Sequence, residues 1–259
     1  MKVVAVIPSH LASVRFPRKI LYPIHGIPMI EHVRRRALLS KGLEEVYVAT
    51  CDLEIKETIE SYGGKVIMTS NTHKNGTSRV AESVKDIDCT HVILLQGDEP
   101  LLIPSYIDSF LNSIQAYPDR DSWNATGPIE TEEESNRHSF VKCIVNNNHR
   151  ILTCFRRSPC YGDFSKIKPI LRKILGIIAF KKNFLIQIAN LSPSPFEEIE
   201  FIEQMRIIEN EFSLFSIPFN ESLPSINEPQ EADIVLKDLE NNPIQRNLLS
   251  QILVNKMNE

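Results

Sequence analysis

Short apolar runs alternate with amphipathic helical segments through the first 116 residues, and this alternation limits the folds that the chain can adopt. The apolar runs have the length of buried strands, whereas the segments between them have the apolar periodicity of helices. Strands that alternate with helices form parallel sheets with right-handed crossovers. The pattern predicts strands at residues 3–7, 45–50, 65–68 and 91–95, and helices at residues 29–39, 54–62, 77–84 and 104–116. The sequence therefore predicts an α/β fold with a doubly wound, mostly parallel sheet, whose ligands bind at the carboxyl ends of the strands.

After about residue 120 the pattern changes to strands separated by polar turns. The chain is long enough for one large domain, so we expect residues 1–259 to form a single domain whose two halves, about 1–120 and about 121–259, share one sheet. We expect Trp123, Phe155 and Phe180 to lie in its core and His32 to be structural. The second half is predicted to contain strands at 125–129, 141–145, 151–155, 176–180 and 214–218, a turn at 146–148, and helices at 196–210, 230–239 and 244–257.

Composition excludes several classes of protein. The net charge of −4 argues against general nucleic-acid binding, which needs a basic surface. No apolar run approaches the length that spans a bilayer, and the N-terminus begins with a strand-like run in place of a signal peptide. The five cysteines form no CxxC pair, so we interpret them as reduced thiols. We expect a cytoplasmic protein that binds neither nucleic acid nor membrane.

A basic loop follows the first predicted strand. Arg15, Arg18 and Lys19 lie within five positions, close to the hydroxyl of Ser13. Such a loop can wrap a triphosphate with charge-assisted hydrogen bonds. It is neither a Walker A motif nor GxGxxG, because it has no glycine. A solvated basic loop explains the same spacing, so spacing alone leaves both interpretations open.

Two further polar stretches surround predicted strand ends. Asp98, directly after the fourth strand, is well placed to hold Mg²⁺ against phosphates, although a turn with a helix cap is the alternative. The stretch from His73 to Arg79 opens a helix. Its amides can recognise the edge of a base and Arg79 an anion. This signal is weak, because Asn75-Gly76 is also an ordinary turn dipeptide.

Several spaced motifs in one order are more specific than any of them alone. They include Ala12-Ser13-x-Arg15-x-Pro17-x-Lys19, Gly76-Thr77-x-Arg79, Gln96-Gly97-Asp98-Glu99-Pro100, Arg157-Ser158-Pro159 and Glu200-x-x-Glu203-Gln204-x-Arg206. Over nearly the whole chain to about residue 240, the sequence resembles the 3-deoxy-manno-octulosonate (Kdo) cytidylyltransferase, or CMP-Kdo synthetase, family of sugar-acid cytidylyltransferases.

The resemblance implies a Rossmann-like fold of the nucleotide-diphospho-sugar transferase type, with a nucleotide-binding first half and a mixed β second half for sugar binding and dimerisation. It also implies a reaction: the anomeric hydroxyl of the sugar acid attacks the α-phosphate of CTP, which gives a CMP-sugar and pyrophosphate, with Mg²⁺ as Lewis acid. The implied partners are CTP, a small sugar acid and a second copy of the chain. The implied pathway is lipopolysaccharide biosynthesis, with capsule or another glycoconjugate as the alternatives that the sequence leaves open.

Residue roles are carried over by the same resemblance. Arg15, Lys19 and Asp98 are the implied catalytic residues. Asp98 and Asn227 stand at the metal-ligand positions. The implied nucleotide-binding residues are Pro8, His10, Ser13, Arg15, Arg18, Lys19, Asn75, Gly76 and Gln96, and the implied sugar-binding residues are Arg79, Arg157, Glu203 and Gln204.

The sequence departs from the family at some of these positions. His10 replaces an arginine, so a mostly neutral side chain stands where the family has a permanent cation. Arg18 replaces a glycine and offers a compensating charge. Asn227 replaces the aspartate that is the second metal ligand, and this change predicts weaker metal affinity, unless Glu228 substitutes. Cys51 replaces an aspartate, and residues 174, 178 and 180 are apolar where the family has histidine or tyrosine, which predicts a less polar sugar pocket.

Three interpretations follow. The first is an active cytidylyltransferase for Kdo or a variant such as an amino-substituted Kdo. The second is an enzyme of the same fold with another sugar acid or nucleotide. The third is a catalytically weakened binding or regulatory paralogue. The intact residues Asp98, Arg15, Lys19 and Arg79 favour catalysis. His10 and Asn227 favour the third interpretation.

Overall fold

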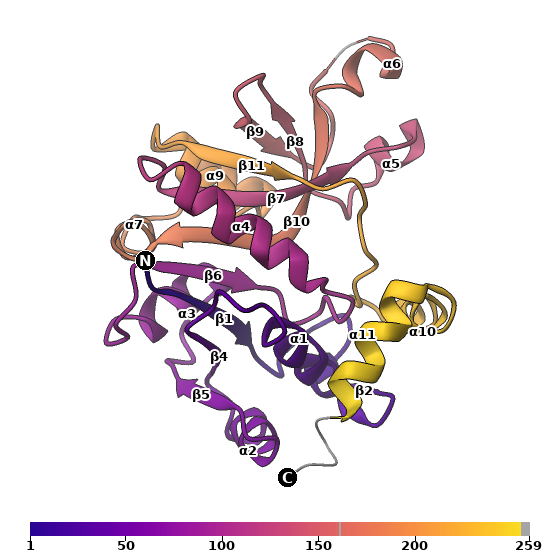
Figure 1. Ribbon diagram of the computed structural model, residues 1–259. Helices are drawn as coiled ribbons and strands as arrows, with labels where there is room; N and C mark the ends of the chain where they lie inside the picture. The colour runs from indigo at the N-terminus through magenta and orange to yellow at the C-terminus, as the bar shows by residue number, and fades with distance from the viewer. Residues whose placement is uncertain (161, 255–259) are drawn as a thin grey trace. The chain divides into compact units, whose positions relative to one another are not determined.

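The computed structural model describes residues 1–160 and 162–254, and the chain divides into two compact units (Figure 1). The first unit combines Met1–Leu111 with Leu223–Glu259, and the second is Asn112–Ser222. The C-terminal segment thus returns to the unit formed by the N-terminal part of the chain. The expectation of a single domain with one shared sheet stays a prediction.

A parallel sheet forms the centre of the first unit. Its strand order is β5-β4-β1-β6, and each neighbouring pair is parallel, as the alternation of strands and helices predicts. β1 is buried along its whole length. The strands of this sheet are β1 (Val3–Ser9), β4 (Glu45–Thr50), β5 (Lys65–Met68) and β6 (His91–Leu95). The other elements are η1 (Lys19–Leu21), β2 (Pro23–Ile24), β3 (Ile27–Pro28), α1 (Met29–Ala37), α2 (Leu53–Ser61), α3 (Gly76–Ser83), η2 (Pro229–Glu231), α10 (Ala232–Asn241), α11 (Pro243–Val254) and α4 (Pro104–Ala116), of which the residues to Leu111 belong to this unit.

Buried polar groups tie the C-terminal helices to the loop that carries Asp98. Gln245 of α11 accepts a hydrogen bond from Arg36 of α1 and donates one to the backbone carbonyl of Leu101. Arg36 also donates to the carbonyl of Leu102. Both side chains are fully buried, so each bond satisfies a group that water cannot reach. This network holds α11 against the segment that directly follows Asp98.

Helices α2 and α3 of the first unit end and begin close to the residues that the sequence predicts, because of the local chemistry of those residues. α2 is followed by Gly63 with φ 69°, the left-handed conformation that glycine adopts at little cost. α3 begins after Asn75, whose side chain accepts a hydrogen bond from the backbone N–H of Ser78. His32 is buried, and its Nε2 lies 2.7 Å from the carbonyl oxygen of Ile24, which confirms its structural role. Burial lowers the pKa of His32 to about 4.

The second unit contains a mixed sheet whose pairing order closes on itself. The order is β10-β7-β11-β9-β8, and β8 pairs in turn with β10. Only β7 and β11 are parallel among these pairs. Trp123, Phe155 and Phe180 lie in the core, as predicted. The elements are β7 (Ser122–Pro128), α5 (Glu132–Asn136), β8 (Lys142–Val145), β9 (Arg150–Phe155), α6 (Phe164–Ile167), β10 (Leu171–Lys181), α7 (Lys182–Ala189), α8 (Pro195–Glu200), α9 (Gln204–Glu209) and β11 (Leu214–Pro218).

The prediction of one helix at residues 196–210 is wrong. The structure has α8 and α9, separated by Phe201 in the left-handed conformation with φ 54°. The reason is tertiary: Glu209, at the end of α9, accepts hydrogen bonds from the backbone N–H groups of Phe196 and Glu197 at the start of α8. These bonds satisfy donors that a helix start leaves open, and a straight helix cannot form them.

Other differences from the predicted elements are smaller. β10 begins before the predicted strand at 176–180, and the short helices α6 and α7 were not predicted. The predicted helix at 244–257 corresponds to α11, and its last three positions lie outside the described residues. All five cysteines are free thiols. Of the helices in residues 1–160 and 162–254, none combines the length and the apolar character that crossing a membrane requires.

Candidate functional site

Lys19, Asp98 and Asn227 meet at the carboxyl ends of β1 and β6, and we call these three residues the strand-end cluster. The ammonium Nζ of Lys19 lies 2.5 Å from Oδ2 of Asp98 and 3.4 Å from Oδ1 of Asn227. It also donates to the backbone carbonyl of Ile226, at 3.2 Å. β1 and β6 are parallel neighbours, so the loops after them emerge side by side. The structure thus brings together three of the predicted site residues from distant parts of the sequence.

The backbone fixes the segment that carries Asn227. The N–H of Ile226 donates to the carbonyl of Asp98 at 3.0 Å, which ties the two loops directly. Glu231 accepts hydrogen bonds from the N–H groups of Asn227 and Glu228. The side-chain amide of Asn227 donates to Ser225, so its oxygen is left to face Lys19. Sequence reasoning missed Ile226, because its backbone groups carry no sequence signal.

The donor set of the cluster suits Mg²⁺ that is bound mainly through a substrate. It offers one carboxylate, one side-chain amide oxygen and one backbone carbonyl around a single point where a cation, the Lys19 ammonium, is held. Magnesium usually takes one or two carboxylates and completes its shell with phosphate oxygens and water. Within the described residues no group of three or more His, Cys, Asp or Glu side chains can hold a metal alone. The residues therefore fit a metal that arrives with phosphates.

Arg15 lies at the edge of the strand-end cluster. Its Nη2 is 3.5 Å from Oδ1 of Asn227, the upper limit of a hydrogen bond. The contact places a second cation on the same oxygen that Lys19 approaches. Two cations beside one carboxylate form a site that favours a polyanion.

Two glycines allow close backbone approach around the cluster. A Cβ atom on Gly76 would lie 3.1 Å from Cγ of Pro8, so the start of α3 packs tightly on the end of β1. A Cβ atom on Gly97 would lie 2.8 Å from Cδ1 of Ile20, closer than real side chains come. The predicted nucleotide residues Pro8 and Gly76 are thus in direct contact, and Gln96 is half-buried beside Gly97.

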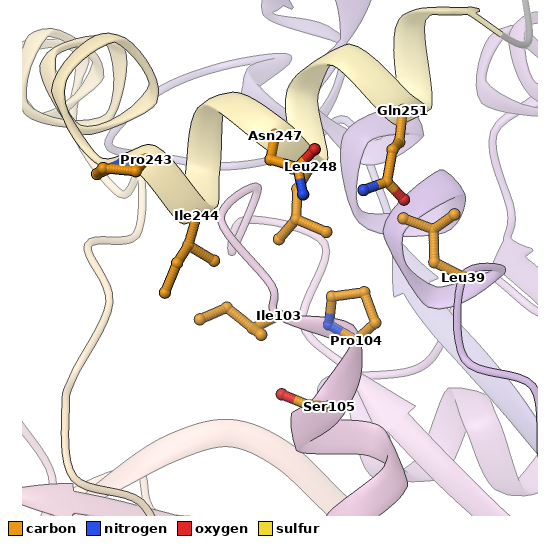
Figure 2. A pocket seen from close by; sticks show the side chains of 9 residues that line it. All are labelled: Leu39, Ile103, Pro104, Ser105, Pro243, Ile244, Asn247, Leu248 and Gln251. Carbon is orange, nitrogen blue, oxygen red and sulfur yellow. The ribbon is translucent and has the colours of Figure 1, made fainter.

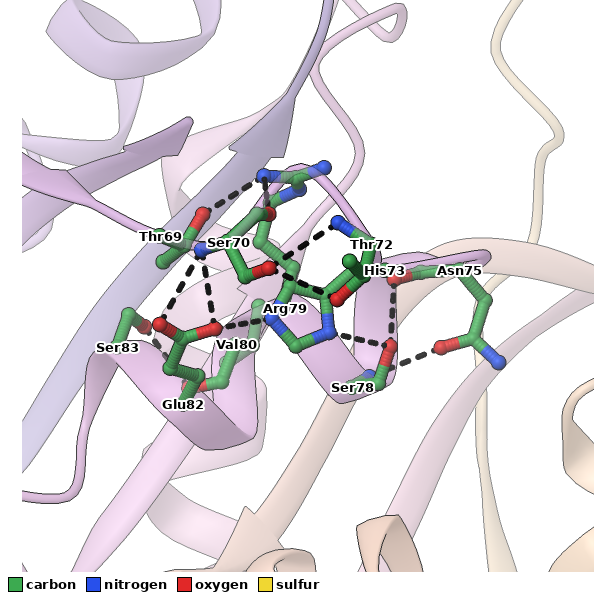
Figure 3. Close-up of polar contacts among 10 residues, drawn as sticks. All are labelled: Thr69, Ser70, Thr72, His73, Asn75, Ser78, Arg79, Val80, Glu82 and Ser83. Atoms are coloured by element: carbon green, nitrogen blue, oxygen red, sulfur yellow. Dashed lines mark hydrogen bonds and ion pairs between the residues drawn. The ribbon is translucent and has the colours of Figure 1, made fainter. Parts of the chain in front are cut away.

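The loop before α3 is held by its own polar side chains, as Figure 3 shows. His73 bridges Ser78 and Glu82, and its hydrogen bond to the Glu82 carboxylate lowers the pKa of Glu82. Nη1 of Arg79 donates to the hydroxyl of Thr69 and to the carbonyl of Ser70. Arg79 was predicted to bind the sugar. It is buried and supports this loop through one nitrogen, and its sugar contact stays a prediction.

Arg18 has an unusual backbone conformation and a partner that the sequence did not indicate. Its φ of 61° and ψ of 17° are left-handed, which explains why glycine suits this position. Its guanidinium forms an ion pair with Glu54 of α2. Phosphate binding by Arg18 stays a prediction. Ser13, in the same loop, donates its backbone N–H to the carbonyl of Leu11 at 2.9 Å.

In the second unit, the predicted sugar-binding residues are placed on separate elements. Arg157 is exposed after β9, and its Nε lies 3.1 Å from Nε2 of His138. Gln204 donates to Oδ1 of Asn124 at 3.0 Å. Glu203 is the residue before α9. Sequence reasoning missed Asn124, a fully buried polar residue of β7, because Ser122 and Thr126 of the same strand are polar too and nothing in the sequence distinguishes Asn124 from them.

The apolar substitutions on β10 lie in the core of the second unit. Ile178 and Phe180 are buried, and Phe180 is fully so, whereas Ile174 is half-buried. Phe180 therefore contributes to packing. The predicted loss of polarity in a sugar pocket therefore depends on Ile174, the most accessible of the three residues.

A separate groove of about 480 Å³ lies elsewhere on the first unit (Figure 2). It is formed where α11 passes the end of α1 and the start of α4. Its walls include Leu39, Ile103, Pro104, Ile244 and Leu248. None of the predicted site residues lines it, and its apolar walls lack the charged groups that a triphosphate requires.

Comparisons with known proteins agree with one another. A family model described as cytidylyltransferase matches residues 4–217. An 8-amino-3,8-dideoxy-manno-octulosonate cytidylyltransferase from Shewanella pealeana is 35% identical over 238 residues, which are 90% of this chain and 97% of that protein. The enzyme of the same description from Shewanella frigidimarina is 38% identical over 81% of this chain and 86% of its own.

Solved structures match the same fold. CMP:2-keto-3-deoxy-manno-octonic acid synthetase complexed with CTP has a TM-score of 0.87 and 31% identity, and the match covers 93% of this chain and 99% of that one. A 4-diphosphocytidyl-2C-methyl-D-erythritol synthase from Anaerococcus prevotii has a TM-score of 0.62 at 12% identity, which is a likeness of fold alone. The predicted fold class of the nucleotide-diphospho-sugar transferase type is therefore confirmed.

Proposed function

The chain belongs to the cytidylyltransferase family, and from that premise we propose that it couples CTP to a 2-keto-3-deoxy sugar acid, with release of pyrophosphate. The hydroxyl oxygen at the anomeric carbon forms a bond to the α-phosphorus, and the bond between that phosphorus and the bridging oxygen of pyrophosphate breaks. The hydroxyl proton leaves to solvent. The observation that carries the proposal is the strand-end cluster, where an ammonium and a carboxylate are 2.5 Å apart at the carboxyl ends of parallel strands.

In this proposal the first unit neutralises and orients the triphosphate. Lys19 and Arg15 are the cations that can exchange their present oxygen partners for phosphate oxygens. His10, Ser13 and Gln96 contribute further polar contacts to the nucleotide. Pro8, Asn75 and Gly76 form the wall against which the base lies. Positioning of this kind stabilises the charge that develops in phosphoryl transfer without covalent participation of the protein.

Asp98 and Asn227 are the residues that would hold Mg²⁺. When bound, the ion polarises the α-phosphate and neutralises the charge of the leaving pyrophosphate. Because only Asp98 is charged, such an ion would be held mainly by the nucleotide, and the Lys19 ammonium, which shares the Asp98 carboxylate, would be available to the phosphates.

Kdo or its 8-amino variant is the proposed sugar acid. The Shewanella relatives are described as acting on the amino sugar, and the solved CTP complex is of a synthetase for the parent acid. Arg157 is the proposed partner of the sugar carboxylate, and Glu203 with Gln204 the proposed partners of its hydroxyl or amino groups. We also propose a cytoplasmic homodimer, as the resemblance to the family implies.

A pyrophosphate-release panel tests the proposal. The protein is mixed with CTP, UTP or ATP and with Kdo, 8-amino-Kdo or a nonulosonate, each with and without Mg²⁺. Pyrophosphate is expected only when CTP, Mg²⁺ and an octulosonate are all present. Release with another nucleotide or acid would favour a different enzyme of the same fold, and binding of CTP without release under any condition would favour a binding paralogue.

A further inference from the structure

Asn227 differs from Asp98, the other candidate metal ligand of the strand-end cluster, because the two ends of its side chain are not equivalent. An amide has an acceptor oxygen at one end and a donor nitrogen at the other, whereas a carboxylate has an oxygen at both. Only an oxygen can bind a cation. A half-turn of the Asn227 amide would exchange its two ends and turn N–H groups toward the cluster. The orientation of this amide therefore decides whether Asn227 can act as a metal ligand.

The backbone around Asn227 is fixed on both sides. The N–H of Ile226 donates to the carbonyl of Asp98 at 3.0 Å, and the N–H of Asn227 donates to the Glu231 carboxylate at 2.6 Å. The same carboxylate accepts the N–H of Glu228 at 3.0 Å. Because the main chain is held in this way, Asn227 can change what it presents to the cluster only by rotation of its side-chain bonds.

The hydroxyl of Ser225 holds the nitrogen end of the amide. Nδ2 of Asn227 donates to Oγ of Ser225 at 3.0 Å, a normal length for a hydrogen bond. Oδ1, at the opposite end, lies 3.4 Å from Nζ of Lys19 and 3.5 Å from Nη2 of Arg15. Lysine and arginine side chains are donors only, so they require the oxygen on their side. Both ends of the amide are thus matched to their partners, and a reversed amide would turn its nitrogen toward two cations.

Ser225 becomes more important when a nucleotide is bound. Within residues 1–160 and 162–254, the Asn227 amide has three hydrogen-bond partners, which are Ser225, Lys19 and Arg15. In the proposed function Lys19 and Arg15 exchange their present oxygen partners for phosphate oxygens. The two cations that select the orientation of the amide then no longer hold it. The hydrogen bond to Ser225 is the contact that remains to keep Oδ1 directed toward the cluster.

We propose that Ser225 is a positioning residue for the metal that arrives with the nucleotide: by holding Nδ2 of Asn227, its hydroxyl keeps Oδ1 available as an oxygen ligand of Mg²⁺. The inference rests on the proposed function, since it takes CTP with Mg²⁺ as the ligand. An aspartate at position 227 would need no such partner, because either of its oxygens could face the ion. Ser225 thus makes an amide usable where the family has a carboxylate.

Isothermal titration calorimetry of CTP binding without sugar acid tests this role apart from turnover. The Kd for CTP is measured with excess Mg²⁺ and again with EDTA, and the ratio of the two values is the gain in affinity that the metal provides. Ser225→Ala is expected to reduce the wild-type gain roughly two- to tenfold, as for loss of one hydrogen bond. Its Kd in EDTA should stay close to the wild-type value, because Lys19 and Arg15 are unchanged.

Ser225→Thr and Asn227→Asp are the matched variants. Ser225→Thr retains the hydroxyl and is expected to retain the gain from Mg²⁺. In the Asn227→Asp background, Ser225→Ala is expected to leave the gain unchanged, because a carboxylate presents an oxygen in either orientation. Ser250→Ala removes an exposed hydroxyl of α11 that binds the Asn247 carbonyl, and it controls for the loss of a serine. A role of Ser225 in local stability alone would weaken CTP binding equally with Mg²⁺ and with EDTA.

The outcomes separate the two claims. CTP binding with the same gain from Mg²⁺ in wild type and Ser225→Ala, or with a gain that Ser225→Ala reduces equally in both backgrounds, overturns this inference and leaves the proposed function intact. An equal loss of affinity with Mg²⁺ and with EDTA, or a wild-type protein that binds CTP without any gain from Mg²⁺, overturns it as well. Failure of all the proteins to bind CTP under either condition overturns the proposed function and this inference with it.

Discussion

The strand-end cluster of the first unit and the sugar-binding candidates of the second differ in how the chain assembles them. In the cluster, Lys19, Asp98 and Asn227 converge on a few oxygen atoms although they are far apart in sequence. In the second unit, Arg157 and Gln204 each bind a different neighbour, His138 and Asn124. The carboxyl ends of parallel strands bring their loops to one edge by topology alone. A mixed sheet with irregular helices gives no such rule.

This contrast teaches that a site at strand ends can be inferred from strand order, whereas a site in a mixed sheet depends on particular contacts. The activity of the strand-end cluster should therefore depend strongly on the charge at one position. Sugar binding by the second unit should depend on individual side chains and on the backbone break that places them. Four substitutions test this difference.

The largest effect is expected from Asp98→Ala. It removes the carboxylate that pairs with Lys19 and the only charged candidate metal ligand of the cluster. Loss of a group that stabilises transition-state charge costs on the order of 10³-fold in turnover. Pyrophosphate release measures turnover, and circular dichroism shows whether the fold survives. Asp88→Ala removes an exposed ion pair with Lys2 and serves as the control. A folded Asp98→Ala protein with more than about a tenth of normal turnover would refute the assigned role.

A smaller effect is expected from Arg157→Gln in the second unit. If Arg157 binds the sugar carboxylate, the KM for the sugar acid should rise about 10- to 100-fold, as for loss of a hydrogen bond to a charged group. The Kd for CTP should stay unchanged, because the change lies in the sugar half. Arg150→Gln, at an exposed arginine that begins β9, is the matched control. An equal rise in both constants would contradict a role specific to the sugar.

Asn227→Asp is expected to change metal use by several-fold. The second carboxylate beside Asp98 should lower the Mg²⁺ concentration that gives half-maximal rate by roughly three- to tenfold, since Mg²⁺ prefers charged oxygen ligands. Asn241→Asp changes an amide of α10 that binds the Lys237 carbonyl, and it controls for net charge. Equal Mg²⁺ dependence in both variants would remove Asn227 from the metal site.

Phe201→Gly tests the break between α8 and α9 and is expected to have the smallest effect. Phe201 is 82% exposed and left-handed, so glycine should raise the free energy of unfolding by about 1 kcal/mol. Urea unfolding measures this value. Ile199→Gly, at an exposed position within α8, should lower it by about 1 kcal/mol. Loss of stability in both variants would mean that the two positions share one helical conformation.

Much of the first unit could be predicted from the sequence, because its information is local. The strands at 45–50, 65–68 and 91–95 have the predicted bounds, and Gly63 ends α2 as expected. The resemblance assigned Asp98 and Asn227 to one site, and the structure brings them together around Lys19. The predicted roles in catalysis and binding still await the experiments above.

The sequence by itself determined the alternation of strands and helices, the family and the residues that stand at strand ends, because periodicity and motif spacing are properties of neighbouring residues. Only the tertiary structure decided that Glu209 folds α9 back on α8 and that Arg18 pairs with Glu54. These outcomes depend on contacts between distant segments. The free energies of such contacts are comparable to those of local conformational preferences, so a local sequence pattern cannot show which of the two prevails.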